Sequence, residues 1–142
     1  ALQLEVIQRI KLFAENPVLA LPKEKRPKDT ITLMMLLENS SKFRWLQKTL
    51  KTIKQNQEKA LIFTRSIQMH AWINLLLEKE FGYNFPPING TVTDKRQGGQ
   101  KLTYKILDDF NRHQGFAALV LSPEVAGVGL NITCANHVIH YG

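Results

Sequence analysis

Residues 116–133 read FAALVLSPEVAGVGLNIT and begin with six apolar residues in an unbroken row. A run without alternation is typical of a strand that is buried on both faces of a parallel sheet. A second such run, Lys59-Ala60-Leu61-Ile62-Phe63-Thr64, also ends on a hydroxyl side chain. Residues 137–141 predict a last strand, and residues 85–90 predict a brief one entered from a proline turn.

Helical spacing of apolar residues separates these runs. The clearest helix is predicted over residues 42–55, and two others over residues 67–80 and 101–112. Trp45 and Trp72 are expected to lie in the core. Apolar strands that alternate with helices of this length indicate an α/β fold, a parallel sheet flanked by helices on both faces. Ligands of such sheets gather at the carboxyl ends of the strands.

The first 38 residues have a different character and predict a helical segment that precedes the sheet domain. An amphipathic helix is predicted over residues 2–14 and ends at Asn16-Pro17, because the residue before proline is pushed out of helical geometry. Residues 17–30 predict an irregular basic connector, and residues 31–38 a short apolar helix. Ser40 or Ser41 caps the next helix. We therefore expect two regions, 1–38 and 39–142.

Length and composition limit the class of protein. The chain has 142 residues, 44% of them apolar, which suits one packed domain and excludes disorder. No apolar run approaches the ~20 residues of a membrane span, and no signal peptide is visible. Cys134 is the only cysteine, which excludes an internal disulfide. The net charge of +7 can attract phosphate backbones, and a well-solvated surface explains it equally without such a partner.

The chain begins at Ala1 without a methionine, so we expect a piece of a longer, intracellular protein. No Gly-Lys-Ser/Thr phosphate loop and no dinucleotide-binding glycine pattern occur, and the four histidines lack metal-ligand spacing. Alone, the chain predicts no catalytic site and no metal site. The segment after residue 121 stands out, because the glycines Gly127 and Gly129 let backbone N–H groups approach a phosphate. A strand-to-strand turn that needs glycine is the alternative.

Four stretches in order resemble the C-terminal RecA-like lobe of Swi/Snf-type superfamily 2 helicases and DNA translocases. The last stretch is the most specific and looks like motif V with its following strand. The stretches are Ser41-Lys42-Phe43-x-x-Leu46; Lys59 to Thr64, similar to motif IV; Asn89-Gly90-Thr91 with Lys95-Arg96 and Asp109-Phe110; and Leu121-Ser122 to Gly127-x-Gly129-Leu130-Asn131-Ile132-Thr133, then Ala135-Asn136-His137-Val138-Ile139.

The resemblance implies a DNA-stimulated ATPase that holds ATP between two RecA-like lobes. The missing first lobe would carry the phosphate loop and the Mg²⁺ carboxylates, and the arginine finger would lie beyond Gly142, in motif VI. The isolated chain would then neither bind these cofactors nor turn over. Gly127 and Gly129 would line the nucleotide cleft. Residues that would contact the backbone of duplex DNA are Thr64, Arg65, Thr91, Arg96, Ser122, Asn131 and Thr133.

Two departures from the family pattern stand in this chain. Ala126 replaces the first glycine of motif V, and Gln97-Gly98-Gly99-Gln100 lengthens the segment after Arg96, so that Arg96 is either a phosphate contact or a solvated loop residue. Other functions that stay open are a non-enzymatic nucleic-acid-binding or protein-interaction module on a RecA-like scaffold, and an RNA-directed helicase. The expected compartment is cytoplasm or nucleoid in a bacterium and nucleus in a eukaryote.

Overall fold

The computed structural model describes residues 15–82, 85–89, 96–97, 100–128 and 134–142. The chain divides into two compact units, residues 1–49 with Gly142 and residues 50–141. The division falls inside α3 (Ser41–Gln55), an unbroken helix. The boundary at residue 39 stays a prediction.

A parallel three-stranded sheet organises the second unit. Its order is β4 (Ala117–Leu121), β1 (Lys59–Phe63), β5 (His137–His140), with Phe63 opposite both Leu121 and His140. The predicted strand at residues 85–90 is reduced to one parallel bridge between Ile88 and Leu121. The predicted α/β class with a parallel sheet is confirmed.

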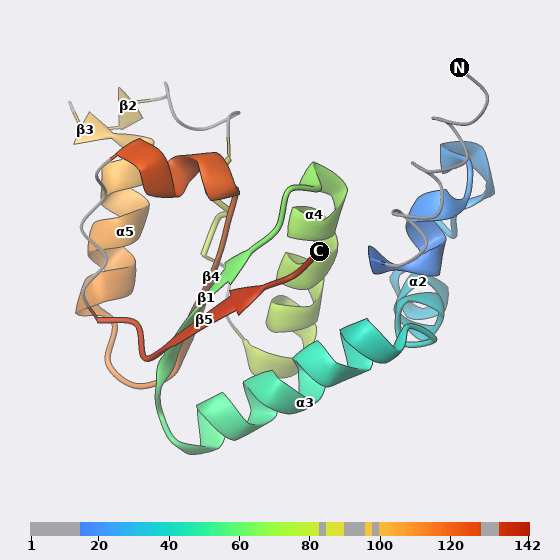
Figure 1. The fold of residues 1–142 in the computed structure, drawn as a ribbon, viewed down its shortest axis with the longest axis horizontal. Helices are drawn as coiled ribbons and strands as arrows, with labels where there is room; N and C mark the ends of the chain where they lie inside the picture. The colour runs from blue at the N-terminus through green and yellow to red at the C-terminus, as the bar shows by residue number, and fades with distance from the viewer. Residues whose placement is uncertain (1–14, 83–84, 90–95, 98–99, 129–133) are drawn as a thin grey trace. The chain divides into compact units, whose positions relative to one another are not determined.

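Helices pack on this sheet from both sides (Figure 1), as predicted for strands without apolar alternation. On one side lies α5 (Leu102–Arg112), and on the other α4 (Ile67–Leu76), which continues as a π-helical turn, Leu77–Phe81. Gly82 ends that turn with a φ of 73° and donates its N–H to the Leu77 carbonyl. Glycine adopts this left-handed conformation without steric cost, so the chain turns sharply there.

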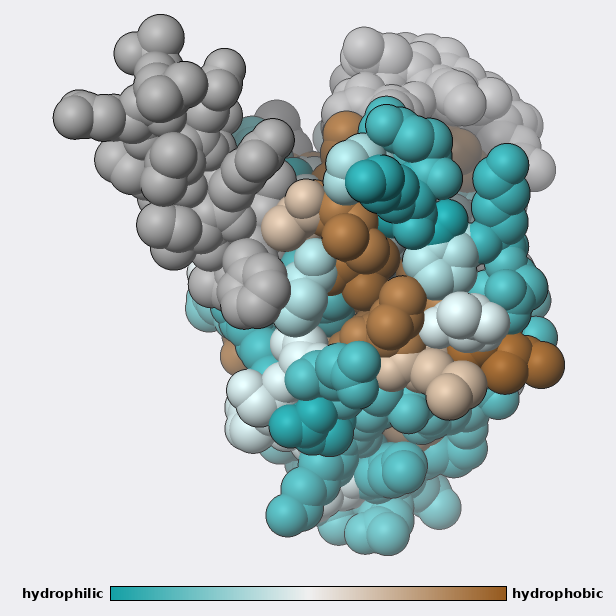
Figure 2. Space-filling view, turned by 90° about the vertical axis from the view of Figure 1, so that its right-hand side faces the viewer, coloured by the Kyte–Doolittle hydropathy of each residue, from teal (hydrophilic) through white to brown (hydrophobic). Residues whose placement is uncertain are grey.

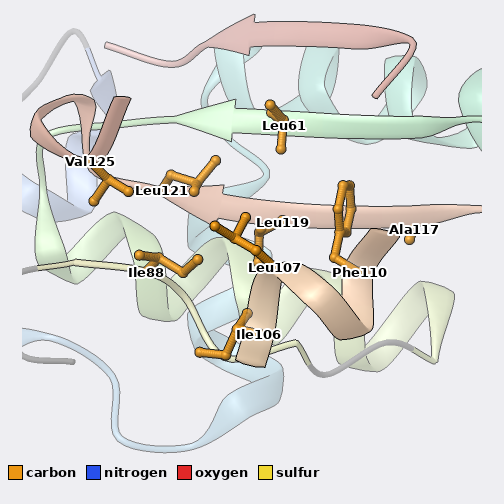
Figure 3. Packing of buried hydrophobic residues seen from close by; sticks show 9 residues of the cluster. All are labelled: Leu61, Ile88, Ile106, Leu107, Phe110, Ala117, Leu119, Leu121 and Val125. Carbon is orange, nitrogen blue, oxygen red and sulfur yellow. The ribbon is translucent and has the colours of Figure 1, made fainter. Parts of the chain in front are cut away.

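The core between α5 and the sheet is formed by alternate strand residues, since successive strand side chains point to opposite faces. Figure 3 shows its nine buried members. Phe85, which is only partly buried, packs edge-on against Phe110 of this core, with ring centroids 5.9 Å apart. The intervening residues Ile62 and Val120 are buried toward the opposite face. The nine members are Leu61, Ile88, Ile106, Leu107, Phe110, Ala117, Leu119, Leu121 and Val125.

Helix α3 begins one residue before its predicted start. The Phe43 N–H donates to Ser40 Oγ at 3.3 Å, so Ser40 is the capping serine. Trp72 is 5% exposed, which confirms its predicted place in the core. The prediction for Trp45 is wrong, because its side chain is 53% exposed. Its neighbour Leu46 lies on the buried face, and one residue along a helix turns the side chain by about 100°.

The first unit contains the predicted basic connector in an ordered form. Two short 3₁₀ turns, Pro17–Ala20 and Lys23–Lys25, precede α2 (Thr30–Leu37). The Arg26 guanidinium donates to the carbonyls of Val18 and Leu21 through Nε and of Leu19 through Nη2. Asn16 caps the first turn and donates its amide to the Leu37 carbonyl at 3.1 Å. Asn16 and Arg26 thus pair with backbone groups of this segment that no regular helix or strand would otherwise satisfy.

Asp29 begins α2 by accepting the Thr32 N–H at 2.8 Å. Hydrogen bonds from Thr32 lower the pKa of the Asp29 carboxyl. Figure 2 views the side on which Figure 1 draws α2, and apolar side chains there form a stripe among hydrophilic ones. Among the described residues of the first unit, the large exposed apolar side chains are Leu21, Ile31, Met35 and Trp45.

The segment that lengthens the chain after Arg96 contains a small antiparallel pair. β2 (Arg96–Gln97) pairs with β3 (Gln100–Lys101), with Gln97 opposite Gln100. Helix α5 follows directly, one residue after its predicted start. Among the described residues, the structure contains no helix long and apolar enough to cross a membrane.

Candidate nucleic-acid interface at the carboxyl edge of the sheet

Thr64 and Ser122 follow β1 and β4 at the same edge of the sheet, as parallel strands require. The Thr64 N–H donates to the Leu121 carbonyl at 3.0 Å, which extends the ladder by one residue. The Ser122 N–H donates to the Ile88 carbonyl at 2.9 Å. The structure therefore brings two of the predicted site residues together on adjacent strands.

The side chains at this edge differ in exposure. Thr64 is only 1% exposed, and its Oγ1 has no hydrogen-bond partner in the described part of the chain. Ser122 is also buried, whereas Arg65 is exposed. An exposed cation thus directly follows, in the sequence, a buried threonine whose hydroxyl has no partner among the described residues. Their predicted contacts with DNA stay predictions.

His70, a buried residue that the site prediction omits, joins the end of β1 to the Ile88–Asn89 segment. Its Nε2 lies 2.7 Å from the Thr64 carbonyl, and its Nδ1 lies 3.4 Å from the Asn89 amide nitrogen. A neutral ring that is protonated at Nε2 satisfies both contacts, donating to Thr64 and accepting from Asn89. Burial lowers the pKa of His70, while the Thr64 carbonyl and the Glu124 charge oppose this shift. The neutral ring therefore fixes the end of β1 against the Ile88–Asn89 segment.

A helical signal for His70 exists in the sequence. His70 stands three residues before Ile73, which is buried, so it shares that face of α4. Its carbonyl partner comes from the strand end, which periodicity alone does not place beside it.

The predicted motif V begins as a 3₁₀ helix, Pro123–Val128, that contains Gly127. Val125 donates its N–H to the Ser122 carbonyl at 3.1 Å. Its side chain belongs to the nine-residue core between α5 and the sheet, called the α5 cluster from here on. The start of this segment is thus fixed to the core. Arg96 lies in β2, and only its backbone is described. Thr91, Gly129, Asn131 and Thr133 lie outside the described residues.

The opposite, amino edge of the sheet is tied by internal bonds. The backbone N–H of Lys59 donates to Asn136 Oδ1 at 3.0 Å, and its buried ammonium donates to the Asn111 carbonyl at 3.1 Å. Beside it, His137 Nε2 lies 3.0 Å from the Glu58 carboxylate. This edge offers its polar groups to the protein itself, so the carboxyl edge is the better candidate for a ligand.

Where side chains are described, no three His, Cys, Asp or Glu groups cluster as metal ligands would.

Comparison with known proteins places this geometry in a family. The model of the helicase conserved C-terminal domain matches residues 41–142. The Zorya protein ZorD of Escherichia coli O139:H28 is 32% identical over 139 residues, which are 97% of this chain and 12% of that protein. YwqA of Bacillus subtilis (strain 168), whose name refers to ATP-dependent helicase or translocase activity, is 33% identical over 141 residues, 99% of this chain and 14% of YwqA.

A solved structure supports the same fold. The Sulfolobus solfataricus SWI2/SNF2 ATPase core in complex with dsDNA superposes with a TM-score of 0.72 at 23% identity, covering 97% of this chain and 26% of that one. The chain therefore spans only a small part of the proteins it resembles. It belongs to the helicase conserved C-terminal domain family and has the RecA-like fold of the C-terminal lobe in Swi/Snf-type ATPases.

Proposed function

We propose that this chain is the second motor lobe of an ATP-dependent Swi/Snf-type translocase that moves on duplex DNA. The family match to residues 41–142 carries the proposal, together with the helicase and translocase names of its relatives. The carboxyl edge of the sheet adds support, because its exposed Arg65 suits a phosphate backbone. Such contacts position a duplex without reading its sequence.

The described residues have distinct parts in this proposal. Arg65 supplies a charge that a phosphate attracts, while the neutral His70 holds the strand end from which Arg65 projects. Val125 anchors the start of motif V in the core, so Gly127 and Gly129 would be presented at one place beside the nucleotide. Movement of this edge would then shift DNA contacts and nucleotide contacts together.

ATP and Mg²⁺ would be held mainly by the first RecA-like lobe. In this proposal the chain therefore has two partners, duplex DNA and that first lobe. Such a site supplies phosphoryl transfer when it is loaded, stabilised by an arginine from motif VI. The chain alone is expected to have no turnover. Its place in the cell would be cytoplasm or nucleoid in a bacterium, or nucleus in a eukaryote.

The deciding experiment is steady-state ATPase activity of the full-length protein with duplex DNA, single-stranded DNA or RNA, with this chain as the negative control. Stimulation by duplex DNA supports the translocase. Stimulation by RNA alone indicates an RNA-directed helicase, and a folded, nucleotide-binding protein without hydrolysis indicates the scaffold function. Gly129→Asp should abolish stimulation, and intact stimulation in that variant would contradict the motif V assignment.

The edge itself is tested by duplex binding. Arg65→Ala should weaken binding and reduce the slope of log K against log salt by about 1, because one phosphate contact is lost. Arg112→Ala is the matched control. The Arg112 side chain is also exposed, to 76%. It ends α5 just before the amino end of β4, at the edge of the sheet opposite to Arg65. Equal losses in both variants would mean that general charge, and not this edge, binds the duplex.

A further inference from the structure

The outward face of α3 combines positive charge with an exposed indole. The helix contains five basic residues and no acidic one. Its buried face is formed by Phe43, Leu46, Leu50 and Ile53. The exposed residues that concern us, called the α3 face from here on, are Arg44, Trp45, Lys48 and Lys51.

Helix geometry makes these four side chains neighbours. Lys48 stands four residues after Arg44, three after Trp45 and three before Lys51, and residues at these spacings meet on a helix surface. Arg44 donates to the backbone carbonyl of Glu38 at 2.6 Å, while the Glu38 carboxylate accepts from Gln47 at 3.1 Å. Like charges at such spacings repel one another, so these side chains together create a positive potential that attracts anions.

We propose that the α3 face binds single-stranded nucleic acid. Charge complementarity favours a polyanion, and Trp45 adds a flat aromatic surface, 53% exposed, beside Lys48. Proteins that bind single strands combine cations along the backbone with aromatic rings on which bases stack. A duplex hides the faces of its bases, so the indole favours an unpaired strand. This surface does not depend on the proposed motor activity or on the carboxyl edge of the sheet.

The two tryptophans make the proposal measurable by fluorescence in the full chain. Trp72→Phe leaves Trp45 as the only indole, and Trp45→Phe leaves the buried Trp72 as an internal control. Oligo(dT) should quench the emission of the Trp72→Phe variant in a saturable, salt-sensitive way and leave that of the Trp45→Phe variant unchanged. A duplex of equal length should not quench Trp45.

Affinity provides an independent readout with labelled oligo(dT). Trp45→Ala should weaken binding about 5- to 150-fold, the range that corresponds to stacking of one base. Lys48→Gln with Lys51→Gln should weaken it further and lower the salt slope, whereas Lys79→Gln, an exposed lysine outside α3, should not. Unchanged Trp72 emission in Trp45→Ala verifies that the core is intact.

Three results would overturn the proposal. They are absence of Trp45 quenching by oligo(dT), equal quenching by duplex DNA, and quenching by poly-glutamate in place of oligo(dT), which would assign the face to an acidic protein. Arg65→Ala separates the two proposals, because it should lower duplex binding without changing binding of oligo(dT).

Discussion

Replacing Thr64 by valine should stabilise the protein, against the usual effect of a substitution in a buried position. Thr64 is 1% exposed, and its Oγ1 has no hydrogen-bond partner among the described residues. An unpaired buried polar group costs about 1–3 kcal/mol, and valine replaces the hydroxyl by a methyl of nearly the same size. We therefore expect Thr64→Val to raise the free energy of unfolding by about 1–2 kcal/mol, or Tm by roughly 3–7 °C for a chain of this length.

Urea unfolding measures this change as a higher midpoint with an unchanged slope. Thr103→Val is the matched control, because Thr103 Oγ1 in α5 is likewise buried and has no partner in the described chain. Both variants should be more stable, but only Thr64→Val should weaken binding of duplex DNA. A lower urea midpoint for Thr64→Val would refute the reasoning, since it would show that the hydroxyl is paired in solution.

Three further predictions concern His70, Phe110 and Gly82. Burial lowers the pKa of His70 below its ordinary 6.5. The neutral ring therefore contributes fully to the free energy of unfolding above pH 6.5, and this contribution is lost as the pH falls toward the folded-state pKa. Urea unfolding across this pH range should show a steeper loss of stability for the native chain than for His70→Gln. Phe110→Ala removes a fully buried ring from the α5 cluster and should cost about 3–5 kcal/mol in urea unfolding, whereas a loss below 1 kcal/mol would contradict the described packing. Gly82→Ala should cost about 1–2 kcal/mol in thermal unfolding, because φ is +73°, although no atom of the described residues lies within 4 Å of the added Cβ. Gly82→Asn should cost less.

The sheet and its helices were predictable because their signals are local. The unbroken apolar runs at 59–64 and 116–121 become β1 and β4, and the helix predicted over 42–55 begins one residue earlier. A parallel sheet that helices cover on both faces explains both the unbroken apolar runs of the strands and the helical spacing between them. Since the carboxyl ends of parallel strands share an edge, the nearness of Thr64 and Ser122 followed from topology.

Features that depend on distant parts of the chain were not predictable from these patterns. The basic connector looks irregular because its order comes from Arg26 and Asn16, whose partners are backbone carbonyls that folding brings near. Trp45 was assigned to the core because it stands next to the apolar face of its helix, although its position beside Leu46 turns it outward. His70 likewise has a clear helical position, but its role depends on a strand carbonyl.

The two edges of the sheet use their polar groups in opposite ways, and this contrast locates the candidate site better than any single residue does. At the amino edge, Lys59 has protein partners for both its backbone N–H and its ammonium. At the carboxyl edge, Thr64 keeps a buried hydroxyl without a described partner, and Arg65 keeps its charge at the surface. An unpaired buried group lowers stability, so natural sequences retain few of them. His70 contacts the Thr64 carbonyl of the same strand end at 2.7 Å, so a ligand that displaced the atoms covering the hydroxyl and paired with it would recover the cost of burying it without a partner.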